Sequence, residues 1–131
     1  MTLAERLEWM IEARNRGEID AVLEHYLPEA EWVTSPSFMF EDVVRGRDSI
    51  RRFWQDYRDE FLEGEWTPED VVEQGQLVVA SIRYEAHGRG SGVPLRGVLH
   101  GITTFRDGKV ARVEMFDSRA DAEHAAGRLR Q

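Results

Sequence analysis

The sequence contains no cysteine among its 131 residues, and this absence excludes several kinds of chemistry at once. Neither a disulfide, nor a thiolate metal site, nor a cysteine nucleophile can form. Long apolar runs are also missing, since none approaches the ~18 residues that a membrane-spanning helix needs. The first residues, Met1 to Glu5, lack the basic and apolar regions of a signal peptide, so we expect a cytoplasmic protein with no membrane partner.

Positive charge is in short supply as well. The chain has 17 Lys and Arg against 25 Asp and Glu, which gives a formal net charge of −8 at neutral pH. A nucleic-acid-binding surface needs clustered basic side chains. The densest basic cluster lies between Arg45 and Arg52, and acidic residues surround it. We therefore expect no nucleic acid as a partner.

Metal-ligand patterns are absent from the sequence. His25, His87 and His124 lie on separate predicted elements, and no cluster of His, Asp and Glu has metal-ligand spacing. The glycine-rich stretch from Gly88 to Gly92 lies between two predicted strands, whereas a phosphate-binding loop needs a helix after it. We expect neither a metal nor a cofactor.

The first half of the chain is predicted to be mostly helical. Thr2 followed by Glu5 is the pattern of a capping box, and apolar residues then recur at helical spacing. The predicted elements are a helix from Leu3 that ends at Gly17, a second helix over Ile19–Leu27 that Pro28 stops, a strand over Ala30–Thr34 and a third helix over Asp48–Leu62.

From Trp66 onward the apolar period changes from that of a helix to that of a strand. The predicted elements are strands over Trp66–Glu73, Leu77–His87, Val93–Arg106 and Lys109–Asp117, then a helix over Arg119–Gly127. Helices followed by antiparallel strands indicate one α+β domain over residues 1–131, with a curved sheet wrapped around the N-terminal helices. Such a cone is expected to admit a small ligand at its mouth.

The clearest local signal is Asp107-Gly108, which predicts a type I′ hairpin turn because that turn needs positive φ at both central residues. With Arg106 opposite Lys109, a regular ladder fixes the register of both strands. The predicted pairs are Thr104 with Ala111, Ile102 with Val113, His100 with Met115, and Val98 with Asp117.

Because side chains alternate across a sheet, those eight residues are predicted to share one face. That face is apolar apart from Thr104, His100 and Asp117, so the two ionisable groups are expected to border a pocket. The opposite face carries a mixture that includes Leu99 and Phe105, and we interpret it as a surface or a homodimer contact.

His100 and Asp117 each allow more than one interpretation. The imidazole of His100 can act as a general acid or base, or it can be a core histidine bonded to a backbone carbonyl or to Asp117. Asp117 can orient His100, act as the base itself, or cap the last helix together with Ser118.

Aromatic residues are the candidate pocket walls, because they can stack on a flat substrate. Core packing is the alternative for Trp54 and Tyr57, and Tyr26 can instead end a core stripe with its hydroxyl at the surface. Phe38 lies in an irregular stretch whose apolar residues need cover, either as a lid or against a partner. The candidate substrate-binding residues are Trp32, Trp54, Tyr57, Tyr26, Met115 and Phe38.

The order of these elements resembles the nuclear transport factor 2-like superfamily and, within it, the SnoaL-like proteins, from about Leu3 to Gly127. The residues that carry the resemblance are turns, caps and packing positions: Gly17-Glu18-Ile19-Asp20, Leu27-Pro28-Glu29-Ala30-Glu31-Trp32, Arg45-Gly46-Arg47-Asp48-Ser49-Ile50, Gly90-Ser91-Gly92-Val93, Phe105-Arg106-Asp107-Gly108-Lys109-Val110 and Arg119-Ala120-Asp121-Ala122.

The resemblance implies a cone-shaped, cystatin-like fold with a small-molecule pocket. SnoaL-like cyclases use an aspartate near the end of the final strand and a histidine on a neighbouring strand, and His100 with Asp117 approximates that arrangement. A cofactor-independent isomerase, cyclase or lyase acting on a small apolar carbonyl compound is therefore one expectation. A non-catalytic ligand-binding or dimerisation domain is the other, because the superfamily includes both kinds of protein.

Overall fold

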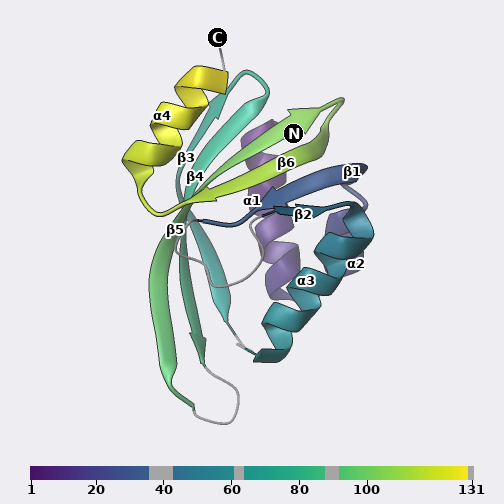
Figure 1. Cartoon of the computed structure of the whole chain (residues 1–131), viewed down its shortest axis with the longest axis vertical. Helices are drawn as coiled ribbons and strands as arrows, with labels where there is room; N and C mark the ends of the chain where they lie inside the picture. Colours follow the sequence, from purple (N-terminus) through teal and green to yellow (C-terminus); the bar gives the residue numbers. More distant parts are fainter. Residues whose placement is uncertain (36–42, 61–63, 88–91, 130–131) are drawn as a thin grey trace.

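A computed structural model describes residues 1–35, 43–60, 64–87 and 92–129, and of residues 57–60 only the backbone. The helices are α1 (Leu3–Asn15), α2 (Ile19–Leu23), α3 (Arg47–Glu60) and α4 (Arg119–Leu129). The strands are β1 (Tyr26–Val33), β2 (Val43–Arg45), β3 (Glu65–Gln74), β4 (Leu77–His87), β5 (Pro94–Arg106) and β6 (Lys109–Phe116). The α+β class is confirmed: the N-terminal helices lie against a curved, unclosed sheet (Figure 1).

The start and end of α1 follow the predicted signals. The Thr2 side chain accepts a hydrogen bond from the Glu5 N–H at 3.0 Å, and the Glu5 carboxylate accepts one from the Thr2 N–H at 3.0 Å. This reciprocal pair satisfies two donors that a helix start leaves open. Gly17 follows the helix with a φ of +81°, the left-handed conformation that glycine adopts without strain.

The second helix is shorter than predicted. It ends at Leu23, and β1 begins at Tyr26, so the predicted helix over Ile19–Leu27 is wrong in its last turn. Pro28 lies inside β1, where the register between β1 and β6 shifts between Tyr26 and Glu31. Proline has no N–H to donate, so a strand accommodates it where the ladder is interrupted. The short strand β2 was not predicted.

The sheet has six strands in the order β2-β1-β6-β5-β4-β3. Neighbouring strands are antiparallel except β1 and β6, which run parallel. β1 and β6, the first and the last of the described strands, therefore lie side by side within the sheet (Figure 1).

The β5–β6 hairpin has the predicted turn but not the predicted register. Asp107 and Gly108 have φ values of +55° and +78°, as a type I′ turn requires, and Arg106 pairs with Lys109. Phe105 then pairs with Val110, but Thr104 pairs with Arg112, so Ala111 is an extra residue in a β-bulge.

A one-residue bulge reverses the faces of every later residue on one strand relative to its partner. Gly101 pairs with Met115, and His100 pairs with Phe116. The predicted pairs of His100 with Met115 and of Ile102 with Val113 are therefore wrong. Phe105 and Val110, which the prediction placed outside, are 2% and 0% exposed in the core.

Two apolar clusters lie on opposite faces of the sheet. The larger one joins α1, α2 and α3 to the concave face, and Trp32, Val113 and Met115 belong to it. The smaller one places the alanines of α4 against Val79 and Ile102 on the convex face. Only the concave face meets the N-terminal helices, so a pocket between helices and sheet has to lie there.

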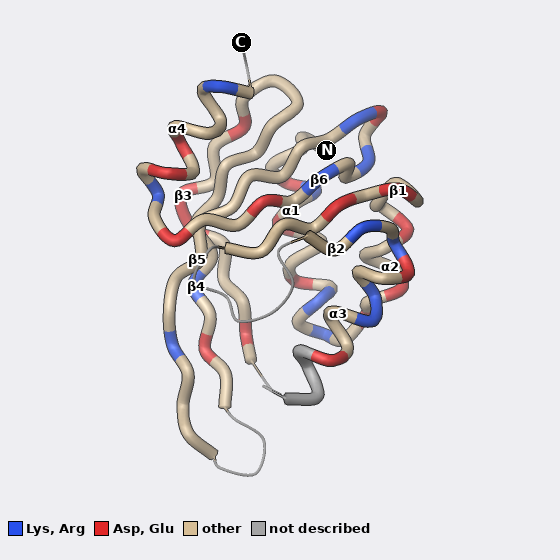
Figure 2. Tube along the Cα trace, viewed as in Figure 1, with Lys and Arg blue, Asp and Glu red and all other residues tan. Residues whose placement is uncertain are grey.

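Charged residues of both signs are interspersed along the trace (Figure 2). Several pair across the convex face, such as Arg83 with Glu69 at 2.8 Å and Arg45 with Glu31 at 2.9 Å. Exposed pairs of this kind contribute little to stability, roughly 0–1 kcal/mol each. Among the described helices, none combines the length and apolarity that crossing a membrane requires.

Candidate ligand-binding site

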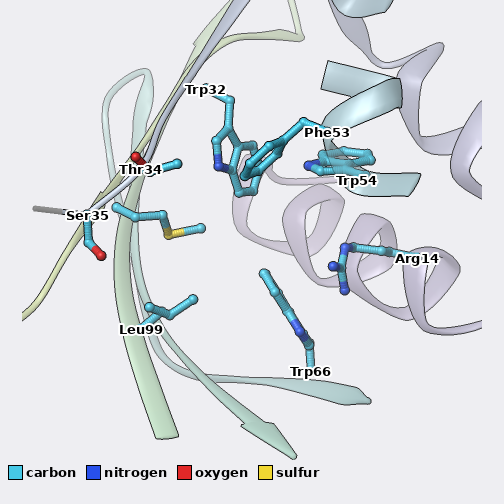
Figure 3. A pocket seen from close by; sticks show the side chains of 9 residues that line it. Arg14, Trp32, Thr34, Ser35, Phe53, Trp54, Trp66 and Leu99 are labelled. Carbon is cyan, nitrogen blue, oxygen red and sulfur yellow. The ribbon is translucent and has the colours of Figure 1, made fainter. Parts of the chain in front are cut away.

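A pocket opens between α1, α3 and the concave face of the sheet (Figure 3). Its cavity volume is about 50 Å³, several times the roughly 10–15 Å³ that one water requires. Most of its walls are apolar, and they come from six elements and the segment that follows β1. The lining residues are Arg14, Trp32, Thr34, Ser35, Phe53, Trp54, Trp66, Leu99 and Met115.

Aromatic rings from β1 and α3 pack against one another and form one wall of the pocket. Trp32 and Trp54 have ring centroids 5.5 Å apart at 83°, and Trp32 lies 6.5 Å from Phe53 at 46°. Tyr26 also packs edge to face against Trp54, with ring centroids 5.5 Å apart at 88°. Such contacts suit the charge distribution of aromatic rings and fix their orientation, so these walls present fixed flat surfaces.

Arg14 and Trp66 contact each other at the wall of the pocket. The guanidinium carbon of Arg14 lies 3.8 Å from the centroid of a Trp66 ring, which is a cation–π contact. The neighbour of Arg14 holds Trp66 in place: Asn15 Nδ2 donates to the Trp66 carbonyl at 2.8 Å, and the Trp66 N–H donates to Asn15 Oδ1 at 3.0 Å. The last turn of α1 therefore positions both parts of the stack.

The polar groups of the pocket are few. The hydroxyls of Thr34 and Ser35 and the guanidinium of Arg14 belong to lining residues. The indole nitrogen of Trp54 is buried and has no hydrogen-bond partner among the described residues. Within this part of the chain, no group of His, Asp and Glu can hold a metal ion.

A second cavity of about 40 Å³ shares Arg14, Trp32, Trp54, Trp66 and Met115 with the first. Tyr26 lines this second cavity and is 5% exposed. Burial raises the pKa of the Tyr26 phenol well above its usual value of 10.0, and the positive charge of Arg14 opposes this effect only in part. Tyr26 is therefore a neutral hydroxyl at physiological pH.

The structure brings several predicted pocket residues together. Trp32, Trp54 and Met115 line the first cavity, and Tyr26 lines the second. The side chain of Tyr57 and the whole of Phe38 lie outside the described residues.

His100 lies on the other face of the sheet. Its Nδ1 is 2.9 Å from Ser81 Oγ, which also accepts a hydrogen bond from Arg119 Nη1 of α4 at 3.0 Å. Because His100 pairs with Phe116 and Ser81, its side chain shares the α4 side of the sheet with Ile102, away from Met115 and Leu99. His100 is not among the residues that line either cavity.

Asp117 follows the last residue of β6 and is exposed. It does not line either cavity. The cap of α4 is Ser118, whose Oγ accepts a hydrogen bond from the Asp121 N–H at 3.1 Å. The structure therefore does not bring His100 and Asp117 together at the pocket.

Sequence analysis missed several lining residues, of which Arg14 is the most informative. Arg14 lies seven residues after Leu7 and four after Met10, so it shares the buried face of α1. A charged residue on an otherwise apolar helix face was the signal that pointed to it. Leu99 was missed for another reason, because the predicted register put it on the wrong face.

Comparison with known proteins agrees with this architecture. The sequence matches the SnoaL-like domain family over residues 7–113. No curated protein matches it at a significant level.

Solved structures of similar shape are distant in sequence. A nuclear transport factor 2-like protein of unknown function from Burkholderia pseudomallei has a TM-score of 0.79 and 17% identity, covering 92% of this chain and 95% of that one. TerC, crystallised with polyporic acid, has a TM-score of 0.77 and 20% identity over 94% and 97% of the two chains. IdmH, a candidate polyketide cyclase from Streptomyces antibioticus, has a TM-score of 0.75 and 18% identity, covering 97% of this chain and 99% of that one. These likenesses show the fold, and the match over residues 7–113 shows that the chain belongs to the SnoaL-like domain family.

Proposed function

We propose that this protein binds a small, flat, largely apolar molecule in the pocket between the N-terminal helices and the concave face. The observation that carries this proposal is the composition of the walls, in which Trp32, Trp54 and Trp66 converge with Phe53 and Met115 on one cavity. Rigid aromatic walls with few polar groups suit a planar apolar ligand. The likeness in fold to TerC, a protein crystallised with polyporic acid, also supports a ligand-binding function.

Binding without catalysis is the function that the pocket chemistry favours. A general acid or base has to lie within hydrogen-bond reach of the proton that it moves, directly or through one water. Among the described residues that line the two cavities there is no carboxylate and no imidazole. A guanidinium such as that of Arg14 stays protonated at physiological pH, and burial raises the pKa of the Tyr26 phenol, so Tyr26 also stays protonated.

A cofactor-independent isomerase, cyclase or lyase acting on a small carbonyl compound is the second candidate. Its support is the likeness in fold to IdmH and the donors in the pocket, since N–H groups aimed at a carbonyl oxygen stabilise an enolate. In this case the proton would be carried by solvent, by the ligand or by groups beyond the described lining.

The homodimer through the outer face of the sheet remains a prediction. That face exposes Val72 and Val98, which are 42% and 45% exposed, beside the ion pair of Arg83 with Glu69. The cytoplasmic location also remains a prediction.

The test uses 2-acetylnaphthalene, a flat neutral ketone, as the probe. Binding is followed by the fluorescence of tryptophan, since three of the four tryptophans line the pocket. Leu99→Trp should fill the pocket and weaken binding at least about tenfold. The matched control is Val98→Trp, because the neighbouring residue on β5 faces the other side and is 45% exposed.

The two candidate functions give different results in the same samples. Exchange of the methyl protons of the ketone for deuterium, followed by NMR in heavy water, reports enolisation. Binding without accelerated exchange supports the binding protein, and binding with accelerated exchange that Leu99→Trp abolishes supports the enzyme. No binding of the ketone, or equal binding by the Leu99→Trp and Val98→Trp variants, would overturn the proposed pocket.

A further inference from the structure

We infer that the ligand of this pocket carries an anionic oxygen, as in a carboxylate, an enolate or a phenolate, which Arg14 and the indole N–H of Trp54 bind together. This inference rests on the proposed function and adds the chemical class of the ligand. It depends on a donor without a described partner and on a cation, both in the same apolar cavity.

The indole nitrogen of Trp54 is the first observation. Trp54 is 4% exposed, and its Nε1 is buried without a hydrogen-bond partner among the described residues. In Figure 3 this nitrogen lies at the end of the ring that is turned toward Phe53 and Trp32. Leaving a buried donor unpaired is costly, so a ligand oxygen that accepts from it gains the hydrogen bond and removes the penalty.

Arg14 is the second observation. Among the described residues that line the two cavities, it is the only one with a formal charge at neutral pH. The guanidinium carbon of Arg14 lies 3.8 Å from the centroid of a Trp66 ring, so the charged group is held at the pocket by a cation–π contact. A guanidinium has five donors, so Arg14 can bind a ligand oxygen while it keeps other partners.

The positions of the two donors define how such a ligand would lie. Arg14 comes from α1 and Trp54 from α3, and both line the first and the second cavity. Figure 3 shows these two residues on the helix side and Leu99 on the sheet side of the pocket. The anionic oxygen would therefore point toward the helices, and the apolar body would lie against Leu99 and Met115.

Because the protein as a whole is negatively charged, a preference for an anionic ligand has to come from the pocket itself. A chain with a net charge of −8 repels anions at long range, so tighter binding of an anion has to come from short-range contacts. Inside an apolar cavity such charge-assisted hydrogen bonds are stronger than in water.

The experiment compares two probes of nearly the same shape, 2-naphthoate and the neutral 2-acetylnaphthalene, by titration calorimetry. We expect the wild-type protein to bind 2-naphthoate about tenfold more tightly than the ketone. Arg14→Gln should remove this preference, lowering the affinity for 2-naphthoate about tenfold and that for the ketone less than about twofold. Trp54→Phe, which keeps an aromatic ring but removes the N–H, should lower the affinity for 2-naphthoate more than that for the ketone.

Two matched controls make the same chemical changes outside the pocket, so they show whether the effects depend on the position of Arg14 and Trp54. Arg16→Gln removes a positive charge two residues away, at the exposed C-cap of α1 where Arg16 pairs with Glu18. Trp9→Phe makes the same ring change on α1 at a residue that does not line either cavity. Both variants should keep the wild-type preference for 2-naphthoate.

Each outcome is decisive. Equal affinity of the wild-type protein for both probes overturns the inference but leaves the proposed function standing, and this comparison needs no variant to fold. An Arg14→Gln effect of equal size on both probes also overturns the inference, because it means that Arg14 only supports packing. Failure of both probes to bind overturns the proposed function and this inference with it.

Discussion

Asn15 and Trp66 form a reciprocal pair of hydrogen bonds that joins the end of α1 to the edge of the sheet, at 2.8 and 3.0 Å. β3 is an edge strand and pairs only with β4 in the described sheet, where Trp66 lies opposite Tyr84. The side-chain amide of Asn15 has one donor and one acceptor group, like a backbone peptide. Asn15 therefore satisfies the outward backbone groups of Trp66 as a neighbouring strand would.

Replacing Asn15 with leucine should lower the free energy of unfolding by about 2 kcal/mol, because two part-buried backbone groups lose their partners. Urea denaturation measures the change. Asn15→Asp keeps the acceptor but not the donor, so its free energy of unfolding should lie between those of the leucine variant and the wild type. A leucine variant as stable as the wild type would show that water replaces both bonds without cost.

Gly97 is needed because the ring of Tyr84 lies directly over it. A Cβ at position 97 would lie 2.5 Å from Tyr84 Oη and 2.7 Å from Cζ. Gly97→Ala should therefore destabilise the protein by about 1–3 kcal/mol, as overpacking typically does. In a Tyr84→Ala background the same change should cost much less, which a double-mutant cycle measures. Equal costs in the two backgrounds would mean that Tyr84 is not the obstacle.

Tyr26 makes stability depend on alkaline pH. The phenol ionises near 10.0 when exposed, and burial raises its pKa in the folded protein. The folded state therefore binds the proton more tightly than the unfolded chain, so this contribution is complete below pH 10.0 and is lost as pH rises above it. Tyr26→Phe should reduce the fall in unfolding free energy above that pH. A fall of unchanged steepness in Tyr26→Phe would assign the alkaline loss to other groups.

His100→Ala tests which face of the sheet His100 serves. We expect the affinity for 2-acetylnaphthalene to stay unchanged, because His100 bonds to Ser81 on the α4 side of the sheet. Stability should fall by about 1 kcal/mol, the usual value for one lost hydrogen bond. Calorimetry and urea denaturation measure the two effects. A loss of affinity as large as that of Leu99→Trp would return His100 to the candidate site.

Local signals were enough to predict most of the fold. The capping box at Thr2 and Glu5, the turn at Asp107-Gly108 and the bounds of the strand Leu77–His87 are all confirmed. Each depends on residues close together in the sequence, whose preferences act wherever the segment lies. The α+β order followed from the change of apolar period at Trp66.

The register of the β5–β6 hairpin was not predictable from the turn alone, because the bulge lies beyond it. A sign of the bulge is present in the sequence. Val110, Val113 and Met115 are the buried residues of β6, and the step from Val110 to Val113 is odd. A strand with strict alternation buries residues at even steps, so an odd step marks an extra residue between them.

The extra residue Ala111 decides which side chains of β5 face the candidate site. The aromatic walls at Trp32 and Trp54 were predicted from composition and helical spacing and did not depend on register. Leu99 and His100 did depend on it, so the bulge exchanged the two between the pocket and the opposite face. Arg14 and Trp66 come together from α1 and β3 through Asn15, a long-range contact that no local pattern contains.

The central position of β6 has a consequence for how the protein is made. Among the described strands, β1 and β2 join the others only through β6, which leaves the ribosome after the other five. Until it emerges, Trp32 belongs to a two-stranded fragment and Trp66 to a three-stranded one. A nascent chain therefore has no complete pocket to offer a ligand until β6 has been synthesised, and the binding site forms only once that strand joins the sheet.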